Sequence, residues 1–128
     1  PRDTFPTRLR GIYTGVQWLL QTFKPEEIAF EELFFSKNVT TGIQVGGARG
    51  VALVACQAYT DKLFEYTPMQ IKQAVVGYGG ADKHQVQMMV RMLLGLKEIP
   101  RPDDAADAVA CAITHAHAGA GREHFRIK

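Results

Sequence analysis

Residues 26–33, "EEIAFEEL", follow Pro25 directly and hold a short apolar run between two pairs of acidic residues. Proline disfavours a helix around it, and a buried run this short is typical of a strand. We therefore predict a buried strand in this stretch. Because side chains alternate along a strand, Glu31 and Glu32 should point to opposite faces of the sheet.

Helical patterns lie on both sides of this strand. Apolar residues recur at helical spacing from Thr7 to Lys24, where Pro25 ends the run. From Thr41 to Tyr59 we predict a second helix, with glycines four residues apart along one ridge. Each glycine costs about 1 kcal/mol of helix propensity relative to alanine. The ridge therefore indicates close packing, either on the domain's own sheet or against a second subunit: Gly42, Gly46 and Gly50.

The rest of the chain predicts one more strand and three more helices. "LFEYTP", residues 63–68, reads as a short strand. Helices should follow at 69–76, along the apolar stripe of 86–94, and from about Pro102 onward. Asp82, in the glycine-rich loop "GYGGADK", is placed to cap the second of them. Strands that alternate with helices predict an α/β fold with parallel pairing.

Two strands make a poor sheet, because parallel strands covered by helices on both faces need neighbours. The sequence opens on Pro1, with no initiator Met, so we expect further strands upstream of it. Residues 1–118 are predicted to form a single domain. Residues 119–128, "GAGREHFRIK", are predicted to form a loose tail.

Composition fits an ordinary globular protein of 128 residues, with 46% hydrophobic and 22% charged residues. The formal net charge of +2 permits nucleic-acid binding without predicting it, because such proteins usually carry a dense basic patch. Cys56 and Cys111 lie in apolar helical stretches, which indicates buried, reduced thiols and a cytoplasmic location. We find neither an apolar run of transmembrane length nor a leader, so no membrane association is predicted.

The last predicted helix begins with three acids, in "RPDDAADAVACAITHAH", residues 101–117. Asp104 and Asp107 lie about 60° apart on the helical wheel and can aim at one point, whereas Asp103 fits a cap or a solvent-facing position. Capping and the helix dipole explain many acids at helix starts. A metal site is the alternative reading.

Glu31 favours the metal site, because it ends a strand and ligands of open α/β sheets lie outside strand ends. If the last helix packs across that end, Glu31 converges with Asp104 and Asp107. Clustered carboxylates suit Mg²⁺ or Mn²⁺, which can promote phosphodiester cleavage. His115 lies roughly 16 Å along the helix from Asp104 and cannot share this metal. It and His117 are interpreted as a pair that complements the helix dipole.

Four stretches resemble the RuvC-type Holliday junction resolvases, the crossover junction endodeoxyribonucleases of bacteria: "IAFEELFFSKN", "GGARGVAL", "QIKQAVVGYGGADKHQVQMMV" and "DDAADAVACAITHAH". The resemblance runs from the first helix to about His117. It implies a ribonuclease H-like fold, with a mixed sheet flanked by helices, and a cytoplasmic homodimer. It also implies Mg²⁺-dependent nicking of four-way junction DNA in recombination and repair, together with a branch-migration helicase complex.

The resemblance also assigns roles to individual residues. It implies three catalytic carboxylates that hold the metal ions: Glu31, Asp104 and Asp107. Lys72 and Lys83 match basic residues near the junction backbone, where they would neutralise phosphates. Phe34 matches an aromatic residue at the junction centre, where a ring can stack on bases. Without the resemblance, the lysines would be read as solvated and Phe34 as a core residue.

One departure from the family bears on activity. The family begins with a strand that carries a Gly-x-Asp-Pro-Gly-like signature, whose aspartate is the central metal ligand, and two more strands follow it. No such stretch occurs in this sequence. We therefore expect a resolvase fold without its first three strands, which cleaves poorly by itself. A non-catalytic junction-binding dimer and an inactive fragment are the alternatives.

Overall fold

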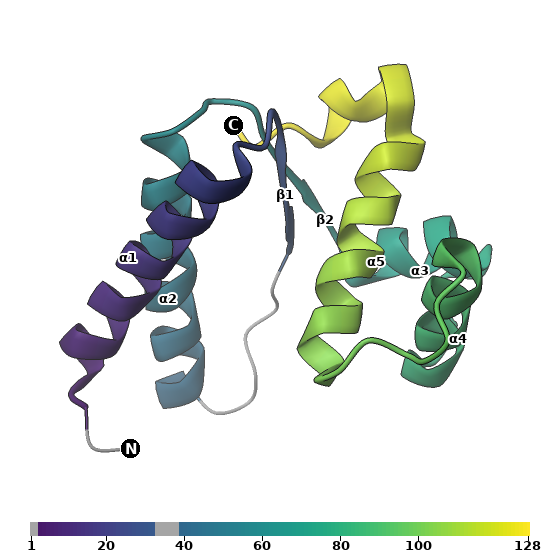
Figure 1. The fold of residues 1–128 in the computed structure, drawn as a ribbon, viewed down its shortest axis with the longest axis horizontal. Coiled ribbons are helices and arrows are strands. Elements are labelled where there is room, and N and C mark those ends of the chain that lie inside the picture. The colour runs from purple at the N-terminus through teal and green to yellow at the C-terminus, as the bar shows by residue number, and fades with distance from the viewer. Residues whose placement is uncertain (1–2, 33–38) are drawn as a thin grey trace. The chain divides into compact units, whose positions relative to one another are not determined.

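The structure is a computed structural model that describes residues 3–32 and 39–128. Its helices and strands follow the predicted order, and the last helix continues into a 3-10 helix (Figure 1). The elements are α1 (Phe5–Phe23), β1 (Ile28–Glu31), α2 (Val39–Gln57), β2 (Leu63–Tyr66), α3 (Pro68–Val76), α4 (Lys83–Leu94), α5 (Asp103–Ala118) and η1 (Gly119–Phe125).

Local capping chemistry sets where the helices begin and end. Thr67 and Asp82 each form a capping box, in which the side chain accepts the backbone N–H three residues later and a glutamine returns a bond. The predicted cap at Asp82 is therefore confirmed. Lys24 ends α1 in the left-handed region, with its N–H bonded to the carbonyl oxygen of Leu20. The capping box at Asp82 fixes Lys83 as the first residue of α4.

The two strands pair in parallel. The Ile28 N–H donates to the carbonyl of Lys62 at 3.1 Å, and the Glu32 N–H donates to the carbonyl of Tyr66 at 2.7 Å. In both bonds the acceptor lies 34 residues after the donor, as parallel register requires. Outside this two-stranded sheet, Phe64 also forms an isolated antiparallel bridge with Arg126. The predicted α/β pairing is confirmed.

The described residues form two compact units. The α1–α2 unit holds those two helices, which lie side by side (Figure 1). The sheet unit holds both strands, apart from their first residues, and every later helix. Within the α1–α2 unit the close approach falls at Gly47, where an added Cβ would lie 3.2 Å from the Phe5 ring. The predicted ridge residue Gly50 has open space instead, because it lines an apolar hollow between α1 and α2 together with Gly47.

Among the described residues, α2 alone is long and apolar enough to cross a membrane, judged by length and composition. No helix of this kind was predicted from the sequence. This is weak evidence for a membrane span, because core helices of soluble proteins pass the same test. Arg49 lies near the middle of α2, where a charge would cost about 2.5 to 3.5 kcal/mol in a bilayer.

The core of the sheet unit forms where α3, α4 and α5 pack together and against β2. Its largest fully buried side chains are Phe64, Tyr66 and Val90. The expected loose tail is packed instead. Phe125 in η1 lies against this core, with its ring centroid 4.7 Å from that of Tyr66. Residues 119–125 thus form a 3-10 helix rather than a loose tail, anchored at Phe125 because an aromatic side chain gains free energy by burial.

His115 also packs into this core. Its Nδ1 lies 2.6 Å from the Tyr66 hydroxyl, and its ring centroid lies 4.5 Å from that of Phe64. The reading of His115 as a residue that complements the helix dipole misses this role. Its part-buried hydrogen bond instead ties the end of α5 to β2.

The two cysteines are free and buried, as predicted. Burial, and secondarily the charge of Glu31, raises the pKa of the Cys111 thiol from about 9.0 to about 11. At pH 8 the thiolate of Cys111 should therefore be about a hundredfold scarcer than that of an ordinary cysteine. We expect iodoacetamide to spare Cys111 in the native chain and to modify it in guanidinium. Peptide mass mapping checks this, and modification of native Cys111 at the rate of a free thiol would contradict it.

Candidate metal centre

A cavity of about 260 Å³ lies in the sheet unit at the carboxyl end of β1. Its lining combines two carboxylates, two lysines and an apolar floor: Glu31, Asp107, Lys72, Lys83, Pro68, Ile71, Val86 and Ala110. Each polar residue has a structural reason for its place. Glu31 ends β1, Lys83 is the first residue of α4, and Lys72 and Asp107 lie in the early turns of α3 and α5.

Glu31 is the electrostatically strained member of this group. Burial raises the pKa of Glu31 above its ordinary value, and the negative charge of Asp107 raises it further. Lys83 and Lys72 act in the opposite direction, by a smaller amount. Two carboxylates that repel one another in a partly buried place gain when a cation lies between them. The Glu31–Asp107 pair therefore has the electrostatics of a cation site.

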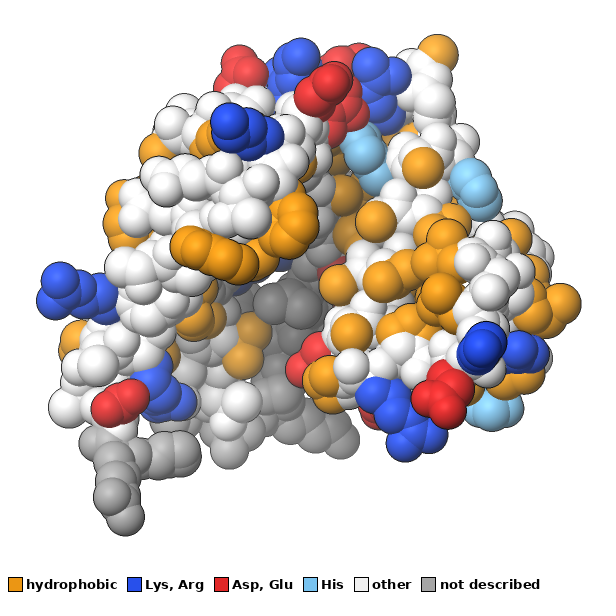
Figure 2. All heavy atoms as spheres, in the orientation of Figure 1, with side chains coloured by type: hydrophobic (Ala, Val, Ile, Leu, Met, Phe, Trp, Pro, Cys, Tyr) orange, Lys and Arg blue, Asp and Glu red, His pale blue; other side chains and the backbone are white. Residues whose placement is uncertain are grey.

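Lys83 supplies positive charge at the edge of this cavity. Its ammonium nitrogen lies 3.5 Å from Asp107 Oδ2 and 3.8 Å from Asp103 Oδ2. These side chains are partly or largely exposed, so the ion pairs contribute little stability. Figure 2 shows acidic and basic side chains beside one another at the end of this unit where α5 begins.

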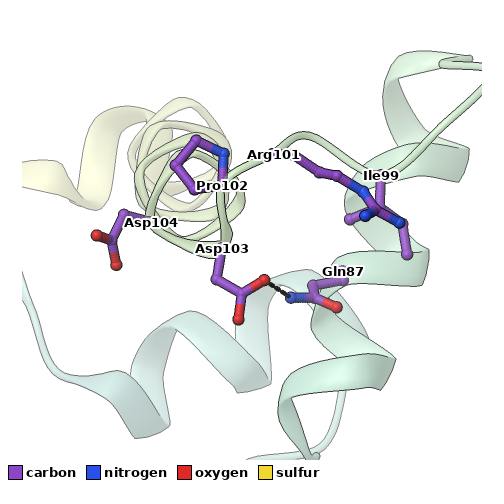
Figure 3. Close-up of a pocket in the computed structure, with 6 residues that line it drawn as sticks. All are labelled: Gln87, Ile99, Arg101, Pro102, Asp103 and Asp104. Atoms are coloured by element: carbon purple, nitrogen blue, oxygen red, sulfur yellow. Dashed lines mark hydrogen bonds between the residues drawn. The ribbon is translucent and has the colours of Figure 1, made fainter.

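Asp104 lies apart from the Glu31–Asp107 cavity. It lines a second hollow, of about 530 Å³, with Asp103, Gln87 and Arg101 among its neighbours. Figure 3 shows Asp103 directed at Gln87, whereas Asp104 projects in a different direction, away from Gln87. Within the described ranges, no three His, Cys, Asp or Glu side chains are close enough together to hold one metal ion.

The structure thus brings together part of the predicted set. Glu31, Asp107, Lys72 and Lys83 meet around one cavity. Asp104, the second residue of the same helix, lies one turn before Asp107 but faces a different hollow. Phe34 lies outside the described residues, so its predicted role stays a prediction.

Sequence reasoning missed the contacts that Asp103 makes. It was predicted to cap the helix or face solvent. The helix start has no side-chain cap, and the Asp103 side chain is 69% exposed, so the solvent-facing alternative is confirmed. At the surface Asp103 also accepts a hydrogen bond from Gln87 and pairs with Lys83. The available signal was the four-residue spacing of Lys83 and Gln87, which puts both on one face of α4.

Paired carboxylates beside lysines, at the end of a parallel strand, are typical of sites that hold a divalent cation against a phosphate ester. Residues 1–115 match the protein family described as "Crossover junction endodeoxyribonuclease RuvC". The chain belongs to this family, whose members are metal-dependent nucleases.

Named relatives agree with the family match. The RuvC protein of Alkaliphilus oremlandii is 51% identical over 123 residues, which cover 96% of this chain and 75% of the relative. The RuvC protein of Brevibacillus brevis is 56% identical over 111 residues, which cover 87% of this chain and 67% of the relative.

Solved structures of the family have the same fold. Thermus thermophilus RuvC in complex with a Holliday junction substrate is 43% identical and superposes with a TM-score of 0.88. That match covers 95% of this chain and 74% of the solved one. A second Thermus thermophilus RuvC structure, 41% identical, gives a TM-score of 0.81 over 92% of this chain and 69% of that one. The predicted ribonuclease H-like fold is therefore confirmed.

Proposed function

We propose that this chain acts as a structure-selective endonuclease that resolves four-way DNA junctions by metal-dependent hydrolysis of phosphodiester bonds, in recombination and repair. The observation that carries the proposal is the cavity in which Glu31 and Asp107 face one another beside Lys72 and Lys83. A solved relative bound to a Holliday junction supports the choice of substrate.

The residues of the cavity fit a hard divalent cation, Mg²⁺ or Mn²⁺. Glu31 and Asp107 offer carboxylate oxygens, the donors that such ions prefer. Asp104, one turn earlier on α5, is the proposed third ligand, which a change of side-chain rotamer would bring toward Asp107. A bound ion of this kind activates water and stabilises the oxygen that leaves phosphorus.

The chain's own residues would orient the DNA strand. Lys72 and Lys83 line the same cavity as the carboxylates, so their ammonium groups can bind the phosphates on either side of the bond that breaks. In hydrolysis a water oxygen bonds to phosphorus, the bond from phosphorus to a sugar oxygen breaks, and that oxygen takes up a proton. Phe34 is proposed to stack on a base at the junction centre.

We also propose that the enzyme is a homodimer, held through α2. Three strongly exposed apolar residues lie within about 60° of one another on this helix: Val39, Ile43 and Val54. An apolar stripe on a helix surface favours a protein contact. A dimer would present two cavities to the two symmetric strands of a four-way junction. A cytoplasmic location and a branch-migration helicase partner follow from the family resemblance.

A synthetic junction tests the proposed function. We expect nicking of a four-way junction in Mg²⁺, little nicking of a linear duplex of the same sequence, and none in EDTA. Because the relatives are longer than this chain, the assay should use the 128-residue chain and a version completed to the length of the Alkaliphilus oremlandii relative. We expect weaker nicking by the 128-residue chain, because its sequence has no counterpart of the first-strand aspartate that the family resemblance implies as the central metal ligand.

Two results would contradict the proposal in different ways. Junction binding without nicking by either version, in Mg²⁺ and in Mn²⁺, would favour the non-catalytic junction-binding dimer. Equal affinity for the junction and the linear duplex would contradict structure selectivity itself.

A further inference from the structure

Lys83 is held by two acids that face different parts of the site. Asp107 lines the cavity with Glu31, whereas Asp103 lines the neighbouring hollow. The Lys83 ammonium contacts both, at 3.5 and 3.8 Å. Asp103 is the more exposed of the two, with 69% of its side chain open to solvent against 37% for Asp107. Lys83 therefore has one partner in the metal centre and one partner outside it.

Asp103 is itself oriented by α4. Gln87 Nε2 donates to Asp103 Oδ1 at 3.3 Å (Figure 3). Lys83 lies 3.8 Å from the other carboxylate oxygen, Oδ2. Because Lys83 and Gln87 are four residues apart, α4 presents two donors on one face to a single carboxylate. Asp103 is the first residue of α5, so this contact joins the starts of the two helices that carry Lys83 and Asp107.

We propose that Asp103 is a positioning residue that keeps Lys83 beside the metal centre once a divalent cation has neutralised Asp107. This proposal rests on the proposed function and deepens it. When Asp107 binds a cation, its attraction for Lys83 falls, and the flexible lysine would leave the cavity edge. Asp103 lies outside the Glu31–Asp107 cavity, so a cation bound there does not take its carboxylate away from Lys83. Asp103 can then hold the ammonium where a DNA phosphate arrives.

The expected sign of a substitution separates this role from simple charge repulsion. An exposed acid near DNA repels the phosphates, so its removal should tighten DNA binding. If Asp103 acts through Lys83, removal of the Asp103 charge should instead weaken DNA binding. Lys83 would then be mobile in the free protein, and DNA binding would have to include the entropy cost of fixing its side chain.

The experiment measures junction affinity of the full chain in Ca²⁺, with a fluorescent four-way junction, for Asp103→Asn with and without Lys83→Met. We expect Asp103→Asn to weaken binding by about threefold to tenfold in the presence of Lys83, the range for fixing one flexible side chain. In the Lys83→Met background the same change should leave binding unchanged or tighter. A mutation cycle of this kind isolates the coupling between the two residues.

Three controls accompany the cycle. Asp103→Glu keeps the charge and should restore affinity to within about twofold. Glu98→Gln removes an exposed acid from the linker before α5 and should not weaken binding. Lys83 should react faster with an acetylating reagent in Asp103→Asn than in the parent chain when Ca²⁺ is present, as read by mass spectrometry.

The outcomes distinguish the two proposals. An equal effect of Asp103→Asn in both backgrounds, or tighter binding in the presence of Lys83, would overturn the positioning role while junction binding by the parent chain stands. No preference of the parent chain for the junction over a linear duplex would instead contradict the proposed function.

Discussion

Replacing Glu31 by glutamine is expected to reduce junction cleavage by at least about a hundredfold and to make the metal-free chain more stable. A metal-ligand carboxylate supplies several kcal/mol of transition-state stabilisation through the ion that it holds, and each 1.36 kcal/mol corresponds to a factor of ten in rate. Glutamine keeps the size of the side chain and removes its charge. The loss of rate therefore reports the charge of Glu31.

The gain in stability follows from the direction of the Glu31 pKa. Burial and Asp107 raise the pKa of Glu31 in the folded chain above its value in the unfolded chain. The folded state then binds more protons between the two values, so the free energy of unfolding falls as pH rises through this window. At neutral pH the charged Glu31 destabilises the metal-free fold. Glu31→Gln removes that cost, and Mg²⁺ should stabilise the parent chain more than the variant.

Glu32→Gln is the matched control for this prediction. The two glutamates are adjacent, and strand alternation points them to opposite faces of the sheet. Glu32 contributes its backbone N–H to Tyr66, which the substitution leaves in place. Cleavage rates and melting temperatures with and without Mg²⁺ give both readouts. Cleavage by the Glu31→Gln chain at the parent rate would contradict the proposed role of Glu31 as a metal ligand.

Replacing Phe64 by alanine is expected to lower the free energy of unfolding by about 3 to 5 kcal/mol, the range for emptying a buried aromatic site. Phe64 is fully buried, and its ring lies against His115. The guanidinium carbon of Arg126 lies 5.6 Å from the centre of the same ring. The substitution therefore removes contacts to both α5 and the end of the chain.

Urea unfolding followed by circular dichroism measures this loss, and Phe23→Ala is the control. The Phe23 side chain at the end of α1 is 70% exposed, so its removal should cost less than about 1 kcal/mol. Equal effects of the two substitutions would show that Phe64 is not part of the core that the structure describes.

The order of helices and strands could be predicted from the sequence because each element carries a local signal. Apolar periodicity marks α1 and α4, and the short run after Pro25 marks β1. The cap at Asp82 could be predicted because capping depends on neighbours along the chain. These signals need no knowledge of which elements pack together.

The candidate site was only partly predictable, because its geometry depends on packing between distant elements. The spacing of Asp104 and Asp107 allows a shared target, yet the structure places them in different hollows. The packing of Phe125 against Tyr66 could not be predicted either, because the seven residues of η1 contain one aromatic side chain and show no periodic apolar pattern. Long-range pairs such as His115 with Tyr66 have no sequence signature at all.

The packed residues after α5 affect how this protein should be handled. Phe125 contacts the buried ring of Tyr66 and Arg126 contacts that of Phe64, three and two residues before Lys128. An affinity tag joined directly to Lys128 would begin beside those rings, so a flexible spacer should separate it from the fold. Deletion of Phe125 and Arg126 would uncover the aromatic rings of Tyr66 and Phe64 that these residues contact.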